Sequence, residues 1–273
     1  MTSLSKLPYA FSYLSPYLAF WLTVSGSITG SFLACLVSRR QSHESILTGR
    51  SHCQACRHPL HVSDLIPIIS YLTHRGRCRY CGSKIPVSCF MAELSGALLY
   101  LAIFLRFGIT WNTLMWLMAG TLLLAMSLID AAERIIPNRI LLLLAAVRFL
   151  FLPLSPNSLG RELLSILTGT LIIPGAMLFL TLLMDKVMKK ETMGGGDIKL
   201  IFVLGLYLDW KNMFFMIFIS CSLGLLWIAV RKIFLRQNEI SDSTIAFGPF
   251  LAIGCLAALC LGEPFIRWYV NLF

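Results

Sequence analysis

Two aspartates stand at the edges of strongly apolar stretches, where charged side chains are unusual. Asp130 closes the run Thr113–Ile129, and Asp197 comes directly before the run Ile198–Leu208. An ionisable side chain at the end of a membrane segment is costly unless it faces a cavity or a partner, so it marks a candidate functional site. Two carboxylates at one membrane edge can share a proton, so that one activates water while the other protonates the leaving group. The pattern therefore predicts an aspartic protease pair.

Three glycines, Gly194, Gly195 and Gly196, precede Asp197, and Lys199 follows it. Consecutive glycines cost backbone entropy and contribute no side chain to a core, so they indicate either close backbone approach or a flexible joint. We expect them to let an extended substrate backbone lie against Asp197. The competing interpretation is that each aspartate is a structural acid paired with a lysine. Because two such acids share one predicted face beside the glycines, catalysis is favoured.

Four of the nine cysteines form two Cys-x-x-Cys pairs in the most polar part of the chain, Cys53 with Cys56 and Cys78 with Cys81. Two such pairs match the spacing of four-cysteine zinc sites, in which each pair is a tight turn that directs two thiolates at one ion. Pairing as disulfides is the alternative, and the reducing cytosol favours zinc. Because protein ligands then fill all four positions, this zinc would hold the loop together and do no chemistry.

The composition is that of a membrane protein. Of 273 residues, 57% are hydrophobic and 13% are charged, with a mean hydropathy of +0.77, whereas an ordinary soluble domain is about one quarter charged. The net charge of +10 does not indicate nucleic-acid binding, because the basic residues stand in short loops between apolar runs, as the positive-inside rule describes. We expect membrane lipid, and no nucleic acid, as a partner.

Eight apolar runs are candidates to cross a bilayer, which takes about 20 residues for an untilted helix. They are Tyr13–Val37, Met91–Phe107, Thr113–Ile129, Ile140–Leu154, Leu163–Met184, Ile198–Leu208, Met213–Val230 and Ile245–Leu261. The sixth is the shortest and is either a half-span or a tilted helix, so eight spans are expected, or seven without it. Because lipid satisfies no backbone hydrogen bond, the spans should be helices. The predicted fold is an all-α polytopic membrane protein with about eight transmembrane helices and a cytoplasmic four-cysteine zinc-binding loop module.

The orientation follows from lysine and arginine. If the loop 38–90 is cytoplasmic, alternation through eight spans puts most of the 23 basic residues on its side and both termini on the other. Asp130 and Asp197 then lie on the same, cytoplasmic face, each at a helix end. We divide the chain into a first transmembrane segment at 1–37, a cytoplasmic zinc-binding loop at 38–90 and a polytopic peptidase domain at 91–273.

Several motifs together resemble the bacterial type IV prepilin peptidase family, whose members are polytopic Gly-x-Gly-Asp aspartyl peptidases. The motifs are Gly30-Ser31-Phe32-Leu33, Ser51-x-Cys53-x-x-Cys56, Ser127-Leu128-Ile129-Asp130, Ile136-Pro137-Asn138, Gly194-Gly195-Gly196-Asp197 and Ala246-Phe247-Gly248-Pro249. They extend over most of the chain, and their combination is far more specific than the glycine run alone. Asn138 departs from the family pattern, which usually has Asp there, but both presumed catalytic aspartates are present.

The resemblance implies a membrane aspartyl endopeptidase that cleaves the leader peptide of type IV prepilins or type II secretion pseudopilins. Cleavage would follow a glycine at the cytoplasmic face of the bacterial inner membrane. A prepilin suits such a site because its short basic leader precedes a long apolar helix. The new N-terminus would then be methylated from S-adenosylmethionine. Glu93, one turn into a predicted span, either serves that methyl transfer, as the resemblance suggests, or pairs with an arginine inside the fold.

Two functions from other classes stay open. An ion- or proton-coupled membrane carrier that uses Asp130 and Asp197 would need acids in mid-span, whereas these lie at helix ends. A non-catalytic assembly factor of a pilus or secretion apparatus would more readily have lost one of the two acids, and both are present.

Overall fold

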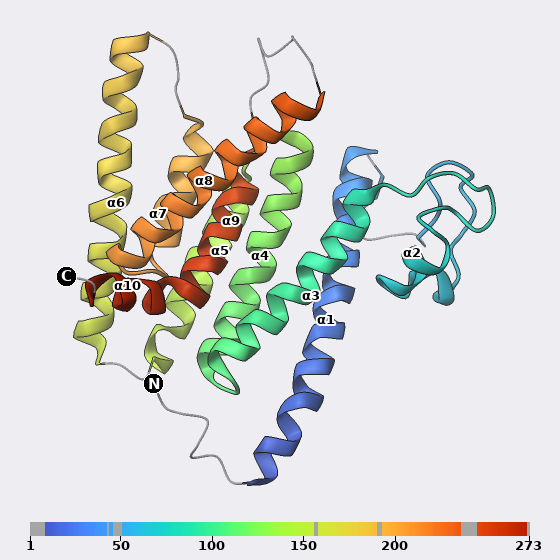
Figure 1. Ribbon diagram of the computed structural model, residues 1–273, viewed down its shortest axis with the longest axis horizontal. Coiled ribbons are helices and arrows are strands. Elements are labelled where there is room, and N and C mark those ends of the chain that lie inside the picture. Colours follow the sequence, from blue (N-terminus) through green and yellow to red (C-terminus); the bar gives the residue numbers. More distant parts are fainter. Residues whose placement is uncertain are drawn as a thin grey trace. The chain divides into compact units, whose positions relative to one another are not determined.

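The computed structural model describes residues 9–42, 44–45, 51–155, 158–189, 193–235 and 245–271 (Figure 1). Within those ranges the regular structure is helical, apart from two isolated β-bridges in the cysteine loop, His52 with Pro59 and Arg77 with Lys84. The predicted all-α class is confirmed. Four of the basic residues considered for the orientation lie outside the described ranges: Lys6, Arg50, Lys190 and Arg236.

The chain divides into two compact units after Thr113. The first contains the long helices α1 (Tyr9–Gln41) and α3 (Val87–Phe107), which lie side by side (Figure 1). Between them in sequence, the cysteine loop carries a 3-10 helix (Val62–Leu65) and the short helix α2 (Ile69–Thr73). The loop and its two flanking helices therefore form one structural body.

Glycines set the distance between α1 and α3. A Cβ added at Gly26 or Gly30 would collide with a carbonyl oxygen of α3, at Gly96 and Ala92 respectively, and a Cβ at Gly96 would collide with the Gly26 carbonyl oxygen. Small residues spaced four apart allow two membrane helices to approach until their backbones touch. Consequently α3, which the sequence-based division placed with residues 91–273, belongs to the first compact unit.

In its described residues the second unit is built mainly from seven helices. They are α4 (Trp111–Glu133, which begins just before the division), α5 (Asn138–Phe151), α6 (Leu159–Met188), α7 (Gly195–Gly205), α8 (Trp210–Leu235), α9 (Gly248–Ala257) and α10 (Glu263–Val270). A π-helical turn, Ala258–Gly262, joins α9 to α10, so the chain stays helical from Gly248 to Val270.

Six stretches of helix in the described residues are long and apolar enough to cross a membrane: Ser15–Gln41, Val87–Phe107, Trp111–Glu133, Leu159–Met188, Trp210–Ile233 and Gly248–Val270. Each corresponds to one of the eight predicted runs. The other two runs are helices too, but α5 has 14 residues and α7 has 11. At 1.5 Å per residue α7 is only about 16 Å long, roughly half of a bilayer core. The half-span alternative for the shortest predicted run thus describes α7 better than a full crossing.

The far end of α7 is fastened by a buried arginine of α5. The Nε of Arg148 donates a hydrogen bond to the carbonyl oxygen of Leu206 at 2.8 Å, just beyond the last residue of α7. One terminal nitrogen of the same guanidinium lies 2.6 Å from Oε2 of Glu162, in the first turn of α6. Tyr207 adds a hydrogen bond from its hydroxyl to the carbonyl oxygen of Leu144. Because a short helix in lipid would leave carbonyls unpaired, these bonds hold α7 in one position.

Candidate active site and metal site

Asp130 lies in the last turn of α4 and only 4% of its surface is exposed. Its Oδ2 accepts a hydrogen bond of 2.8 Å from the backbone N–H of Gly248, the first residue of α9. A Cβ at Gly248 would lie 2.7 Å from that oxygen and 3.2 Å from the sulfur of Met126. A glycine is therefore needed here for the backbone of α9 to reach the carboxylate.

Asp197 lies in the first turn of α7, which begins directly after Gly194. The glycines have different surroundings. A Cβ at Gly196 would stand 3.1 Å from the Cβ of Ile136, in the connection between α4 and α5, whereas a Cβ at Gly195 would meet nothing within 4 Å. Gly196 thus serves close contact inside the protein, and Gly195 faces open space beside Asp197.

The two carboxyls influence each other's charge. Burial, together with the charge of Asp130, raises the pKa of Asp197 from 3.8 to about 6. Asp197 itself lies outside the six stretches that qualify as spans. The aspartates are 67 positions apart in the sequence, yet in the folded second unit the charge of Asp130 acts on Asp197, and the Gly248 N–H of α9 bonds to Asp130. Their environments differ, because Asp130 accepts a backbone N–H and Asp197 holds a proton readily.

Lysine pairing does not account for these acids. The Nζ of Lys199 lies 3.4 Å from Oδ1 of Asn138, at the start of α5. Neither Asp130 nor Asp197 forms an ion pair with a lysine in the described part of the chain. Asn138, which departs from the family pattern, is the first residue of α5, and its uncharged side-chain amide is the partner of Lys199.

The four cysteines of the loop lie together in the first unit. The Sγ atoms of Cys53, Cys56, Cys78 and Cys81 are all within 4.8 Å of one another, and the thiols are free. The Sγ atoms of Cys53 and Cys81 are 3.9 Å apart. Two sulfur ligands of a tetrahedral zinc ion, each bonded at about 2.3 Å, would be about 3.8 Å apart. The donor set and its geometry fit a structural zinc ion.

Each cysteine pair forms a tight turn that exposes N–H groups to sulfur. The amide of Arg57 bonds back to the Cys53 carbonyl, and the amide of Gly82 to that of Cys78; Gly82 has a φ of +70°, which glycine adopts without strain. Burial opposes ionisation of Cys53, but backbone N–H groups and the Ser83 hydroxyl outweigh it and lower its pKa to about 6. Thiolates are the form that binds zinc.

Glu93, in α3, ties the parts of the first unit together. It is 9% exposed, its Oε1 accepts a hydrogen bond from the Ser31 hydroxyl of α1, and its Oε2 accepts one from the backbone N–H of Ile68 in the loop, both at 2.7 Å. Its partners in the described residues are thus a hydroxyl and an N–H, not an arginine.

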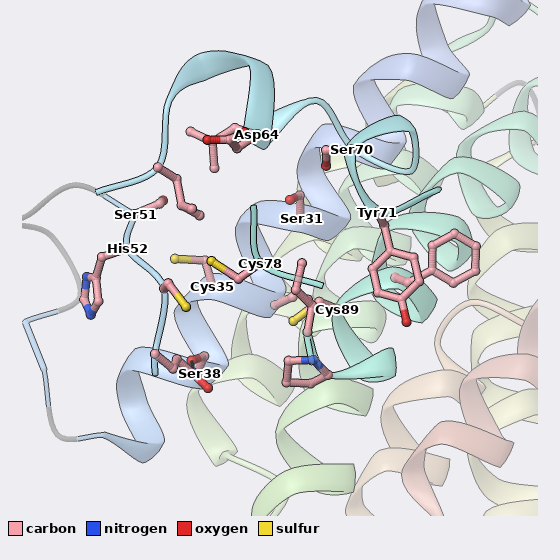
Figure 2. A pocket seen from close by; sticks show the side chains of 18 of the residues that line it. Ser31, Cys35, Ser38, Ser51, His52, Asp64, Ser70, Tyr71, Cys78 and Cys89 are labelled. Atoms are coloured by element: carbon pink, nitrogen blue, oxygen red, sulfur yellow. Dashed lines mark hydrogen bonds between the residues drawn. The ribbon is translucent and has the colours of Figure 1, made fainter. Parts of the chain in front are cut away.

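Glu93 also lines a cavity of about 1030 Å³ enclosed by α1, the cysteine loop and α3 (Figure 2). Ser31, Asp64 and Tyr71 belong to the same wall. Sequence reasoning singled out Glu93 but not the cavity, because its wall is assembled from three separate segments. Gly248 was likewise noted only as part of a motif. Its place before Pro249 at an apolar run was the one sequence signal that the backbone there comes close to another part of the protein.

Comparison with known proteins gives consistent matches. The model of the bacterial peptidase A24 N-terminal domain matches residues 24–107, and that of the type IV leader peptidase family matches residues 117–229. The two matched regions fall on either side of the division after Thr113. No solved structure gives a significant match.

Three relatives named prepilin leader peptidase/N-methyltransferase are each 33% identical to this chain. The one from Bacillus subtilis (strain 168) aligns over 252 residues, 92% of this chain and 97% of its own. Those from Aeromonas hydrophila and Pseudomonas aeruginosa align over 84% and 85% of this chain and 77% and 78% of theirs. With matches of this extent to both domains and to whole relatives, the chain belongs to the type IV leader peptidase family.

Proposed function

We propose that the protein is a membrane aspartic endopeptidase that removes the leader from type IV prepilins or type II pseudopilins, and then N-methylates the new N-terminus. The observation that carries the peptidase assignment is the pair Asp130 and Asp197, two carboxyls of unlike environment whose charges interact. The names of the relatives support the substrate and the methyl transfer.

The unlike environments assign the two roles. The Gly248 N–H donates a hydrogen bond to Oδ2 of Asp130 and partly offsets the cost of burying its ionised form, and we assign to Asp130 the role of taking a proton from the attacking water. Asp197, whose pKa is raised to about 6, carries the shared proton and donates a hydrogen bond to the scissile carbonyl oxygen. When the carbon–nitrogen bond breaks, the leaving amine takes a proton from the pair. Their titration belongs to the pair as a unit.

The place of the pair suits a prepilin. Both acids lie at helix ends that the charge bias puts on the cytoplasmic side of the inner membrane, where the junction between a basic leader and an apolar helix would lie. The open space beside Gly195 leaves room for an extended substrate backbone next to Asp197, as expected of the run Gly194–Gly196.

The test is single-turnover cleavage of a purified prepilin by the full chain in nanodiscs, with product masses read with and without S-adenosylmethionine. Asp130→Asn and Asp197→Asn should each abolish cleavage, while Asp185→Asn, a matched change near the end of α6, should leave it unchanged. Full activity in either variant removes that aspartate from the mechanism. A folded wild-type protein that cleaves nothing would instead favour the non-catalytic assembly factor.

The cysteine cluster is proposed to hold one structural zinc ion, with Cys53, Cys56, Cys78 and Cys81 as its ligands. Bound zinc would supply a cross-link between the two turns and leave no open position for chemistry. Metal analysis of protein purified under reducing conditions should find about one zinc per chain. Protein that is folded without zinc would contradict this assignment.

A further inference from the structure

We propose that the segment Val62–Leu72 of the cysteine loop is embedded in the membrane surface, with its aliphatic side chains in the acyl region and the arginines that follow it on anionic lipid headgroups. The sequence-based division treated 38–90 as a cytoplasmic loop, so this contact would move part of that loop to the boundary between water and lipid. It is independent of the proposed proteolysis and methyl transfer.

The segment exposes a row of large aliphatic side chains. Val62 is 81% exposed and Leu72 is 61% exposed, although neither lies in a stretch long enough to span a membrane. The exposed positions follow the spacing i, i+3, i+4, i+7 and i+10, which is typical of one face of an amphipathic segment. They are Val62, Leu65, Ile66, Ile69 and Leu72. A contiguous apolar surface of this kind marks an interaction site.

Hydrogen bonds to the flanking helices set the depth of the segment. The backbone N–H of Ile68 and the Ser31 hydroxyl of α1 each donate a hydrogen bond of 2.7 Å to the carboxylate of Glu93. Glu93 is six residues, or about 9 Å, along α3 from Val87, its first residue. Tyr71 of α2 also stacks on a ring in the first turn of α3. The segment therefore lies beside the two membrane helices, not beyond their ends (Figure 1).

This depth corresponds to the boundary between headgroups and acyl chains. The last turn of α1 carries Arg39 and Arg40, which belong at the headgroup level. Ser31, on the same carboxylate as Ile68, is about 12 Å further into the bilayer along α1. Each headgroup layer is about 5–8 Å thick, and interfacial segments bury their apolar face by about 5–10 Å. The exposed aliphatic side chains are thus at a level where lipid, and not water, surrounds them.

The exposed row also continues a surface of α1 that is built for lipid. Ile28 and Phe32 are exposed residues within the candidate span of α1. Both line the same cavity as Leu65, so the apolar faces of the helix and of the segment adjoin. Continuity with a membrane-spanning face favours lipid as the occupant.

The charge next to the segment favours anionic lipid in particular. Arg75, Arg77 and Arg79 follow α2 directly and are exposed. Of the charged residues in 51–90, five are basic and one is acidic, and that acid, Asp64, has a buried side chain. Basic side chains beside an apolar surface attract anionic headgroups. The basic leader expected of a prepilin would be repelled here, which argues against substrate as the occupant.

The test identifies what lies against each side chain by photocrosslinking. The photoreactive residue p-benzoylphenylalanine is placed singly at Ile69 and at Leu72 in the full chain. The nanodiscs contain equal parts of phosphatidylcholine and phosphatidylglycerol, and the adducts are identified by mass. Leu171, an exposed residue within the span α6, is the positive control. Ala55 is the matched exposed control, because its neighbour Gln54 bonds to Ser38 near the polar end of α1.

Leu72 and Ile69 should give about tenfold more lipid adduct than Ala55. Among the Leu72 adducts, phosphatidylglycerol should exceed phosphatidylcholine by about fivefold, the effect of one arginine at an anionic surface. The double change Arg75→Gln and Arg79→Gln should remove that excess, and Leu171 should show none.

Each outcome decides the question. Lipid adducts at Ile69 and Leu72 with the phosphatidylglycerol excess support the assignment. Crosslinks from these positions to another part of the chain, or to added prepilin, would overturn it and make a protein the occupant. Adducts as abundant at Ala55 as at Leu72, equal amounts of the two lipids at Leu72, or no adduct at either position while Leu171 reacts would overturn it as well.

Discussion

Replacing Asp197 with Asn should abolish cleavage and yet make the protein more stable at neutral pH. The pKa of Asp197 is raised from 3.8 to about 6 in the folded protein, first by burial and then by the charge of Asp130. A raised pKa means that the folded state binds more protons than the unfolded state between about pH 4 and 6. The wild type therefore loses stability as pH rises through that window, and an amide does not.

The magnitude follows from the shift. About two pKa units correspond to about 3 kcal/mol at 1.36 kcal/mol per unit. Because the Asp197 side chain is partly exposed, solvent screening reduces this to about 1–2 kcal/mol. For a chain of this size the corresponding rise in Tm is about 3–6 °C.

The assay is thermal unfolding in nanodiscs from pH 4 to 8. Wild type and Asp197→Asn should unfold at the same temperature near pH 4, separate as the pH rises from about 4 to about 6, and differ by a constant amount above that. Asp185→Asn should follow the wild type throughout. In the Asp130→Asn background the gain from Asp197→Asn should shrink, because part of the penalty is repulsion between the two carboxyls. Destabilisation by Asp197→Asn at pH 7 would show that Asp197 is a structural acid and refute the reasoning.

Three further changes test the neighbouring groups. Gly248→Ala puts a methyl group 2.7 Å from Oδ2 of Asp130, and loss of that charged hydrogen bond should slow single-turnover cleavage by about 10- to 100-fold; an unchanged rate would mean that the N–H has no part in the reaction. Cys53→Ser and Cys78→Ser should each lower Tm and remove the zinc found by metal analysis. At saturating prepilin, folded Cys53→Ser should still cleave much faster than Asp197→Asn. A Cys53→Ser rate as low as that of Asp197→Asn would show that the zinc loop completes the protease site. The methyl group added by Gly195→Ala meets no protein atom within 4 Å, so Tm should stay the same. It would occupy the space proposed for the substrate backbone, so KM for prepilin should rise. A KM equal to that of the wild type would place the substrate elsewhere.

The sequence by itself determined the class of molecule and the identity of the reactive groups. Hydropathy runs specify membrane helices because lipid leaves the backbone no other partner, and all eight predicted runs are helical in the structure. The two Cys-x-x-Cys pairs specify a tetrahedral cluster because the turn that each spacing allows directs both sulfurs the same way, and the four Sγ atoms do lie together. Two acids at apolar edges were enough to select Asp130 and Asp197 as candidates.

Only the tertiary structure decided what surrounds those groups. The partner of Asp130 is a backbone N–H more than 100 positions away, at Gly248, and no local pattern encodes so distant a contact. The short length of α7 was visible in the sequence, but the group that holds its end was not: Arg148 of α5 bonds the chain just beyond the last residue of α7. Gly26, Gly30 and Gly96 let α1 and α3 approach closely, and the loop between them lines a cavity together with both helices. Residue types carry chemical capacity, whereas pKa values and cavities depend on the distances that folding sets between segments far apart in the chain.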